Sequence, residues 1–385
     1  MLRFLTAGES HGPGLVTIVE GLPKGIEVTE EHIAAELSRR RQGHGRGARM
    51  GIEEDRLEIL GGIRHGRTLG SPVAVVVRNT EWPRWRDVMG IEPDEPGSPM
   101  TRPRPGHADL AGMMKYGTDD ARDILERASA RETAARTVAG SLAKRMLDVV
   151  GVAVISHVVA IGEVTAEGRF PGEGDLEAID ASPVRCLDPD ASAAMVEAID
   201  RAAGDKDTVG GVFEVIGHGV PYGLGSHVQH DRRLDGLIAG GLMSIPGIKG
   251  VGIGDGFDLA HLRGSQAHDE IQPGVGGLVR ASNRAGGIEG GMSNGEPIRA
   301  RAAMKPLSTL MRPLATVDLA SGEPAQAVRE RSDVCAVPAA AVVGEQMVAW
   351  VLACELQRKF GGDTVDELAR SVESFSLWVQ GRFDV

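Results

Sequence analysis

Aromatic residues are scarce in this sequence: phenylalanine, tryptophan and tyrosine together make up 3% of its 385 residues. The core must therefore be filled mainly by valine, isoleucine, leucine, methionine and alanine. The overall balance of 42% hydrophobic and 25% charged residues is that of an ordinary globular protein, with enough chain for a sizeable core in one or two domains. Glycine is abundant, with 53 copies, so we expect many tight turns and close backbone approaches.

Paired cysteines, long apolar runs and an excess of positive charge are also missing. The three cysteines, Cys186, Cys335 and Cys354, lack paired metal-ligand spacing, which favours reduced thiols in a cytoplasmic protein. The first residues, MLRFLTAGES, do not resemble a signal peptide, and no apolar run approaches the length of a membrane span. The formal net charge is −12. We therefore expect a cytoplasmic protein that binds neither membranes nor nucleic acid.

What the chain does contain is a dense group of functional residue types between residues 106 and 136. His107 lies in a glycine-flanked loop, where the backbone can approach a ligand closely. Ser129 and Glu132 then have capping-box spacing, and an apolar stripe at helical spacing follows, so a helix is predicted over about residues 130–149. Fixed cations crowd the approach to this helix and its first turns: Lys115, Arg122, Arg127, Arg131 and Arg136.

These cations predict an anion site at the start of the helix. Arginine beside a helix N-terminus opposes the helix macrodipole unless an anion sits between them. The alternative is that the arginines merely pair with neighbouring acids, which would be Asp119, Asp120, Asp123 and Glu126. We favour the anion site.

A second candidate segment, GESHG at residues 8–12, connects two predicted strands. It matches the G-x-S-x-G elbow of α/β-hydrolases, but in that fold several strands precede the elbow and here almost nothing does. We favour a strand-end loop that presents Ser10 and His11 to a pocket. A solvated turn histidine is the alternative.

A third candidate segment is the arginine-rich run RRRQGHGRGAR at residues 39–49, which contains no acidic residue. Arginine binds phosphate or carboxylate in a bidentate fashion, and the glycines allow backbone amides to take part. In a chain of net charge −12, such a run predicts a multiply anionic small ligand. A solvated charged face is the alternative.

The remaining pattern predicts one α+β domain over residues 1–385, built from two similar halves, because strands and helices follow one another without a neutral linker. Residues 81–85 and 92–105 are expected to form a long loop, and residues 170–190 to be irregular. The run His268-Asp269-Glu270 has ligand types for a metal but no second cluster beside it, so no metal is expected. Predicted strands cover residues 1–7, 15–20, 57–64, 72–78, 152–161, 211–217, 248–256 and 298–304, and further helices cover residues 29–41, 191–203, 234–244, 338–359 and the chain from 364 on.

Five motifs together resemble the chorismate synthase family: GESHG from Gly8, RRRxGxGRGxR from Arg39, RPGHADLAGMMKYG from Arg104, RASARETAAR from Arg127 and RSDVCAVPAA from Arg331. They stand in the family's order, and the resemblance covers essentially the whole chain. It implies a lyase of the shikimate pathway and aromatic amino acid biosynthesis. Members convert 5-O-(1-carboxyvinyl)-3-phosphoshikimate (EPSP) to chorismate and phosphate by 1,4-anti elimination, and they require reduced FMN (FMNH2). The implied fold is a β-α-β sandwich of antiparallel sheets and helices, assembled as a homotetramer.

The resemblance also implies roles for individual residues. The catalytic ones are His11, as an acid toward the departing phosphate, His107, beside the reduced flavin, and Asp333, assisting base chemistry at the flavin edge. Flavin contacts are expected at Arg127, Ala128, Ser129, Pro246, Gly247, Gly290, Lys305, Pro306, Leu307, Ser308, Thr309 and Arg331. Substrate or nucleotide phosphate contacts are expected at Ser10, Arg40, Arg46 and Arg131. Where this chain has Pro246-Gly247, the family often has a polar residue and an alanine, so only a backbone contact is expected there.

Two questions stay open: how the flavin is reduced, and whether the chain is an enzyme at all. The sequence shows neither a dinucleotide-binding fingerprint nor a reductase domain, which favours an external flavin reductase, with NADPH as the candidate reductant. A polyanion-binding module built on the same arginines is the alternative to an enzyme. Such a module would need neither the histidines nor a flavin.

Overall fold

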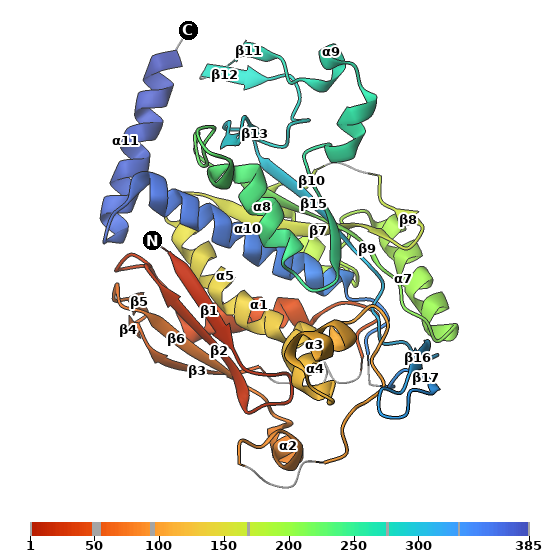
Figure 1. Cartoon of the computed structure of the whole chain (residues 1–385). Coiled ribbons are helices and arrows are strands. Elements are labelled where there is room, and N and C mark those ends of the chain that lie inside the picture. Colours follow the sequence, from red (N-terminus) through yellow and green to blue (C-terminus); the bar gives the residue numbers. More distant parts are fainter. Residues whose placement is uncertain are drawn as a thin grey trace.

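Two antiparallel sheets lie on opposite sides of a layer of helices (Figure 1). The first sheet has the strand order β1-β2-β6-β3, and the second has the order β10-β15-β9-β7-β8. This arrangement confirms the expected α+β class and the sandwich of sheets and helices. The computed structural model describes residues 2–47, 55–92, 97–167, 170–274, 277–329 and 332–383.

The strands coincide closely with the alternating and β-branched segments of the sequence. In the first sheet they are β1 (Arg3–Ala7), β2 (Gly14–Glu20), β6 (Val73–Arg78) and β3 (Arg56–Gly61). In the second they are β10 (Ile248–Ile253), β15 (Ile298–Met304), β9 (Gly211–His218), β7 (Ala153–Ile161) and β8 (Val164–Thr165). Short two-stranded hairpins complete the set: β4 (Ile63–Arg64) with β5 (Arg67–Thr68), β11 (Ile271–Gly274) with β12 (Gly277–Arg280), β13 (Ile288–Glu289) with β14 (Met292–Ser293), and β16 (Ala315–Val317) with β17 (Pro324–Gln326).

The helical layer consists of α1 (Glu30–Arg41), α5 (Thr133–Asp148) and α10 (Val337–Phe360). The apolar stripe of α5 is fully buried, as its helical spacing predicts. On the side of the first sheet, the hydroxyl of Thr17 in β2 donates to the carbonyl of Ala135 in α5 at 2.9 Å. On the other side, α5 and α10 pack on β7, and α10 also packs on β9.

The other helices surround this sandwich. Those that matter for the cavity described below are α2 (Trp82–Met89), α3 (Asp109–Tyr116), α4 (Arg122–Ala128) and α8 (Leu234–Met243). The remaining ones are α6 (Leu176–Ala181), α7 (Pro189–Gly204), α9 (Gly264–Ala267) and α11 (Val365–Phe383).

Several expectations for local structure are wrong. The expected loop after residue 81 begins with α2, because Pro83 lies in the first turn of a helix, where a missing N–H is tolerated. Helix α6 forms within the supposedly irregular stretch 170–190. The segment after His107, for which no element was predicted, folds into α3 and α4. Residues 93–96 of the expected loop lie outside the described residues.

Helix α10 is apolar enough and long enough to cross a bilayer, but its most apolar stretch is 94% buried within the fold. It is therefore a core helix, as its nearly uniform hydrophobicity predicts. Two acidic residues of α10 are buried, Glu345 and Glu355, and the side chain of Glu345 has no exposed surface.

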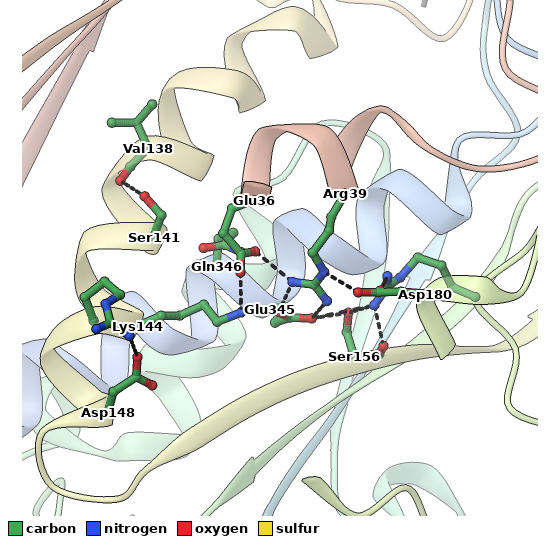
Figure 2. A network of polar contacts seen from close by, with 12 residues as sticks. Glu36, Arg39, Val138, Ser141, Lys144, Asp148, Ser156, Asp180, Glu345 and Gln346 are labelled. Carbon is green, nitrogen blue, oxygen red and sulfur yellow. Dashed lines mark hydrogen bonds and ion pairs between the residues drawn. The ribbon is translucent and has the colours of Figure 1, made fainter. Parts of the chain in front are cut away.

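Glu345 is the centre of a buried ionic network between α10, α5, α1 and β7 (Figure 2). Its carboxylate accepts hydrogen bonds from Arg39 and from Lys144, each at 2.6 Å, and from the hydroxyl of Ser156 at 2.9 Å. Burial alone would raise the pKa of Glu345, but Arg39 and Lys144 hold it well below its ordinary value. The network is balanced in sign, because Arg39, Lys144 and Arg185 face Glu36, Asp180 and Glu345.

We expect Glu345→Gln to lower the free energy of unfolding by about 3–5 kcal/mol, because the buried cations Arg39, Lys144 and Arg185 would then face only two carboxylates. The measurement is urea unfolding followed by circular dichroism. Glu197→Gln, which removes an exposed carboxylate paired with Arg201 on α7, is the control and should change stability by less than about 0.5 kcal/mol. Equal stability of the two variants would show that the network does not hold the helical layer together.

Candidate active site

A cavity of about 250 Å³ opens where the helical layer meets the ends of both sheets. Segments far apart in the sequence form its wall: the β1–β2 turn, the end of α1, the His107 loop, the junction of α4 and α5, the residue after α8, the segment after β15 and the start of α10. Most of the expected site residues line this one cavity: Ser10, His11, Arg40, Arg46, His107, Ser129, Arg131, Pro246, Leu307, Ser308, Thr309 and Asp333.

His11 is held in the β1–β2 turn by a buried carboxylate from α4. The turn requires Gly8, whose φ is 100° and where a Cβ would lie 2.2 Å from the Gly14 carbonyl oxygen. The Nδ1 of His11 lies 2.8 Å from a carboxylate oxygen of Glu126, and the backbone N–H of His11 donates to the same carboxylate at 3.0 Å. Glu126 is almost fully buried and also pairs with Arg122 at 2.9 Å. Burial tends to raise the pKa of Glu126, but His11 and Arg122 keep it below its ordinary value.

His107 has a similar arrangement within its own loop. Gly106 precedes it with a φ of 78°, a conformation that favours glycine. The Nδ1 of His107 is hydrogen-bonded to Asp109, and Asp109 also accepts from the Nε of Arg104 at 2.8 Å. Burial opposes the charge of Asp109, but His107 and Arg104 hold its pKa well below its ordinary value. With Nδ1–H donated to Asp109, the Nε2 of His107 is the nitrogen that can exchange a proton with a ligand.

The cavity arginines are paired with carboxylates instead of standing as isolated cations. Arg131 is bonded to Asp55, and Arg40 lies 3.4 Å from the same carboxylate, which is 2% exposed. Although burial favours the neutral acid, Arg131 and Arg40 lower the pKa of Asp55. Each arginine is thereby fixed in place before any ligand arrives.

Arg46 and Asp333 form a further pair at the cavity. The Nη1 of Arg46 lies 2.8 Å from one oxygen of Asp333, and the N–H of Gly47 donates to the other oxygen at 2.7 Å. The Nε of Arg46 is buried and has no hydrogen-bond partner in the described part of the chain. It is a donor that an anionic ligand could use.

Asn79 organises the site, and sequence reasoning did not single it out. Its side-chain amide donates to the carbonyls of Glu9, Ser10 and Gly12, at 3.2, 3.1 and 2.8 Å. Its side-chain oxygen accepts from the Nε and Nη2 of Arg131, at 3.2 and 3.1 Å. One asparagine thus fixes both the histidine turn and a cavity arginine. Its position after a predicted strand was the only signal in the sequence.

The cavity also has an apolar side that sequence reasoning missed. Leu307, expected there, is joined by side chains from the start of α10, the segment after α8 and the end of β15: Ala336, Ala339, Ala340, Val343, Ile245 and Met304. A ligand with a flat apolar part and anionic groups therefore fits the chemistry of the wall.

Comparison with known proteins decides the family. The family model described as chorismate synthase matches residues 2–356. A chorismate synthase of Parafrankia sp. is 60% identical over 97% of this chain and 98% of its own length, and one of Mycobacterium avium is 57% identical over 99% and 98%. A crystal structure of chorismate synthase superimposes with a TM-score of 0.80 at 41% identity, covering 99% of this chain and 98% of that one.

The chain belongs to the chorismate synthase family. It is therefore a lyase of aromatic biosynthesis in the shikimate pathway, and it acts on a small molecule. Among the described residues there is no group of three or more His, Cys, Asp or Glu side chains that could hold a metal ion.

The structure places the other family-derived positions around the cavity but not on its wall. The guanidinium of Arg127 donates to the carbonyls of Gly8 and Thr6, at 3.0 and 3.1 Å, so it supports the histidine turn. Lys305 donates to the carbonyl of Gly106 at 2.8 Å and so supports the His107 loop. Ala128, Gly247 and Pro306 are the sequence neighbours of cavity residues or of these two supports.

Gly290 stands apart from the cavity. Gly290 lies in the β13–β14 hairpin, next to Gly291, whose carbonyl accepts from Leu234 at the first residue of α8. The cavity meets the opposite end of α8, about 15 Å away for a helix of ten residues. Arg331 lies outside the described residues.

The expected capping box at the start of α5 is wrong. A 3-10 turn, Ala130–Glu132, precedes the helix, and the hydroxyl of Ser129 accepts from the N–H of Arg131 instead of Glu132. The carboxylate of Glu132 accepts from Thr6 and Arg136, at 3.0 and 2.9 Å, and so joins this segment to β1.

Asn79→Ala should lower the free energy of unfolding by about 1–3 kcal/mol, because it leaves buried donors of Arg131 and carbonyls of the histidine turn unpaired. We also expect faster amide hydrogen exchange in residues 9–12. Asn283→Ala is the matched control, since Asn283 braces the turn around Gly287 and Pro297 away from the cavity. Asn283→Ala should lower the free energy of unfolding without changing amide hydrogen exchange in residues 9–12. Unchanged exchange there in Asn79→Ala would contradict the bracing role.

Proposed function

We propose that this chain converts EPSP to chorismate and phosphate by 1,4-anti elimination, with reduced FMN bound in the same cavity. One observation carries the proposal: two histidines, each backed by a buried carboxylate, line a single cavity with four arginines, Arg40, Arg46, Arg104 and Arg131. A substrate with one phosphate and two carboxylates needs such a group of cations.

The reaction breaks the bond between the substrate ring and the phosphate oxygen and removes a hydrogen from the ring, and a new double bond forms. In the proposed mechanism, His11 gives a proton to the departing phosphate, and the neighbouring arginines neutralise its developing charge. A histidine suits this step because its ordinary pKa lies near neutral pH.

The wall of the cavity fits a flavin. The buried, unpartnered Nε of Arg46 can donate to an anion, and the apolar wall along α10 can pack against a flat ring. When bound, reduced FMN would supply the electronic chemistry of the elimination. His107 would lie beside the flavin with its Nε2 available to hold or release a proton. Asp333, fixed by Arg46 and by the N–H of Gly47, would assist base chemistry at the flavin edge.

The proposal also covers the assembly of the chain, its location and the source of its reduced flavin. We infer a cytoplasmic homotetramer that receives its flavin already reduced, with NADPH as the reductant of an external flavin reductase. Membership of the family supports these traits.

Anaerobic assay of the purified chain with EPSP and reduced FMN tests the function, and wild-type protein should form chorismate. His107→Ala should lower turnover by about 100- to 10,000-fold while oxidised FMN still binds, because one positioned proton carrier is lost and the arginines remain. His227→Ala, at an exposed histidine, is the control and should behave as wild type.

Absence of chorismate with the wild-type chain would overturn the proposed reaction and favour the polyanion-binding module. Near-normal turnover of His107→Ala would instead overturn only the role of His107.

A further inference from the structure

Two side chains from distant segments of the chain contact the ring of His11. Its Nδ1 faces the carboxylate of Glu126, 115 residues later in the chain. One face of the ring stacks on the indole of Trp85, with centroids 3.9 Å apart and planes inclined by 27°. We call Glu126 and Trp85 the His11 clasp.

The clasp differs from the arrangement around His107. There the carboxylate is Asp109, only two residues away in the same loop, so the pair forms locally. The orientation of the His11 ring depends instead on α4 and α2, which bring Glu126 and Trp85 to the β1–β2 turn. A ring held by two segments other than its own indicates that its orientation itself is specified by the fold.

Trp85 also connects α2 with α4. Helix α2 has no buried residue. Besides stacking on His11, the indole of Trp85 lies under the guanidinium of Arg122, 5.2 Å from the ring centroid, and Arg122 pairs with Glu126. The indole therefore closes a cycle of contacts through Arg122 and Glu126 back to His11.

We propose that Glu126 and Trp85 are positioning residues for His11, with Glu126 fixing the Nδ1–H tautomer and Trp85 fixing the ring plane. This inference rests on the proposed role of His11 as the acid. A carboxylate accepts only, so Glu126 requires a proton on Nδ1 and leaves proton exchange with the substrate to Nε2. Stacking adds resistance to rotation of the ring about its last torsion, which has only a broad intrinsic preference.

The first test compares Glu126→Gln with Asp123→Asn in the full-length chain. Glu126→Gln keeps the shape but places an amide beside Nδ1, so the tautomer is no longer enforced. We expect kcat to fall by roughly ten- to a hundredfold, the effect of losing one charge-assisted hydrogen bond, while KM for EPSP changes less than about twofold. Asp123→Asn makes the same carboxylate-to-amide change on the same helix, at a side chain that accepts from Thr118, and should leave both constants unchanged.

The second test compares Trp85→Leu, Trp85→Phe and Trp82→Leu. Loss of the stacked ring in Trp85→Leu should lower kcat by about two- to tenfold, and Trp85→Phe should restore most of it, because a stacking ring is kept. Trp82→Leu alters the same helix without touching His11 and is the control. Equal losses for Trp82→Leu and Trp85→Leu would show that α2 acts only as a structural support.

Ring ¹⁵N chemical shifts of His11 report its tautomer directly and do not depend on enzyme activity. The His11 signals are identified by their loss in His11→Gln. Wild type should show the Nδ1–H tautomer, and Glu126→Gln a mixed or reversed one. An unchanged tautomer in Glu126→Gln, or an unchanged kcat, overturns the proposal. If wild type forms no chorismate at all, the proposed reaction fails, yet the ¹⁵N shifts still decide whether Glu126 sets the tautomer.

Discussion

The pairing of buried arginines with buried carboxylates is the interaction on which the rest of this structure depends. Removing a charge from water costs several kcal/mol, and a buried cation is stable only beside a well-placed counter-charge. Helix α1 shows the consequence most clearly. Arg39 enters the network around Glu345 in the core, and the next residue, Arg40, lines the cavity beside Asp55. The core network thus fixes the helix that carries a cavity arginine.

The same pairing means that the arginines of the site are already partly neutralised when an anionic ligand binds. From the sequence, the arginines near α5 were expected to stand as like charges that require an anion. In the structure Arg131 pairs with Asp55, and Arg122 pairs with Glu126, one of the acids considered as an alternative partner. The cations are therefore placed in advance and partly neutralised. A ligand would add hydrogen bonds to fixed donors and would not have to gather mobile ones.

Much of the fold could be predicted because its long elements have clear periodicities. The strand at Ile298–Met304 and the apolar helix Val337–Phe360 lie where the pattern placed them, within a residue or two. Short helices such as α2 and α3 could not be predicted, because an internal proline or glycine obscures so short a pattern.

The residues of the candidate site also fall into those that could be predicted from the sequence and those that could not. The motifs predicted the histidines and arginines of the site, because these residue types seldom lie so close together in a sequence. Their partners Asp55 and Asn79 could not be found, because each is one of many ordinary polar residues and is brought to its place only by the tertiary fold. Glu126 was considered as a partner of the arginines, but its bond to His11 could not be predicted for the same reason. The capping box failed for the same reason, since tertiary contacts to Thr6 and Arg136 outweigh the local bond expected of Glu132.

The central claim is that buried carboxylates hold the cavity arginines in place before the ligands bind. The most direct measurement is a pair of crystal structures of this chain, one without ligands and one with oxidised FMN and EPSP. The account predicts both ligands in the cavity lined by His11 and His107. It also predicts that the pairs of Arg131 with Asp55 and of Arg104 with Asp109 stay intact, with side-chain shifts below about 1 Å. Ligands bound elsewhere, or arginines that leave their carboxylates to reach the ligands, would contradict it.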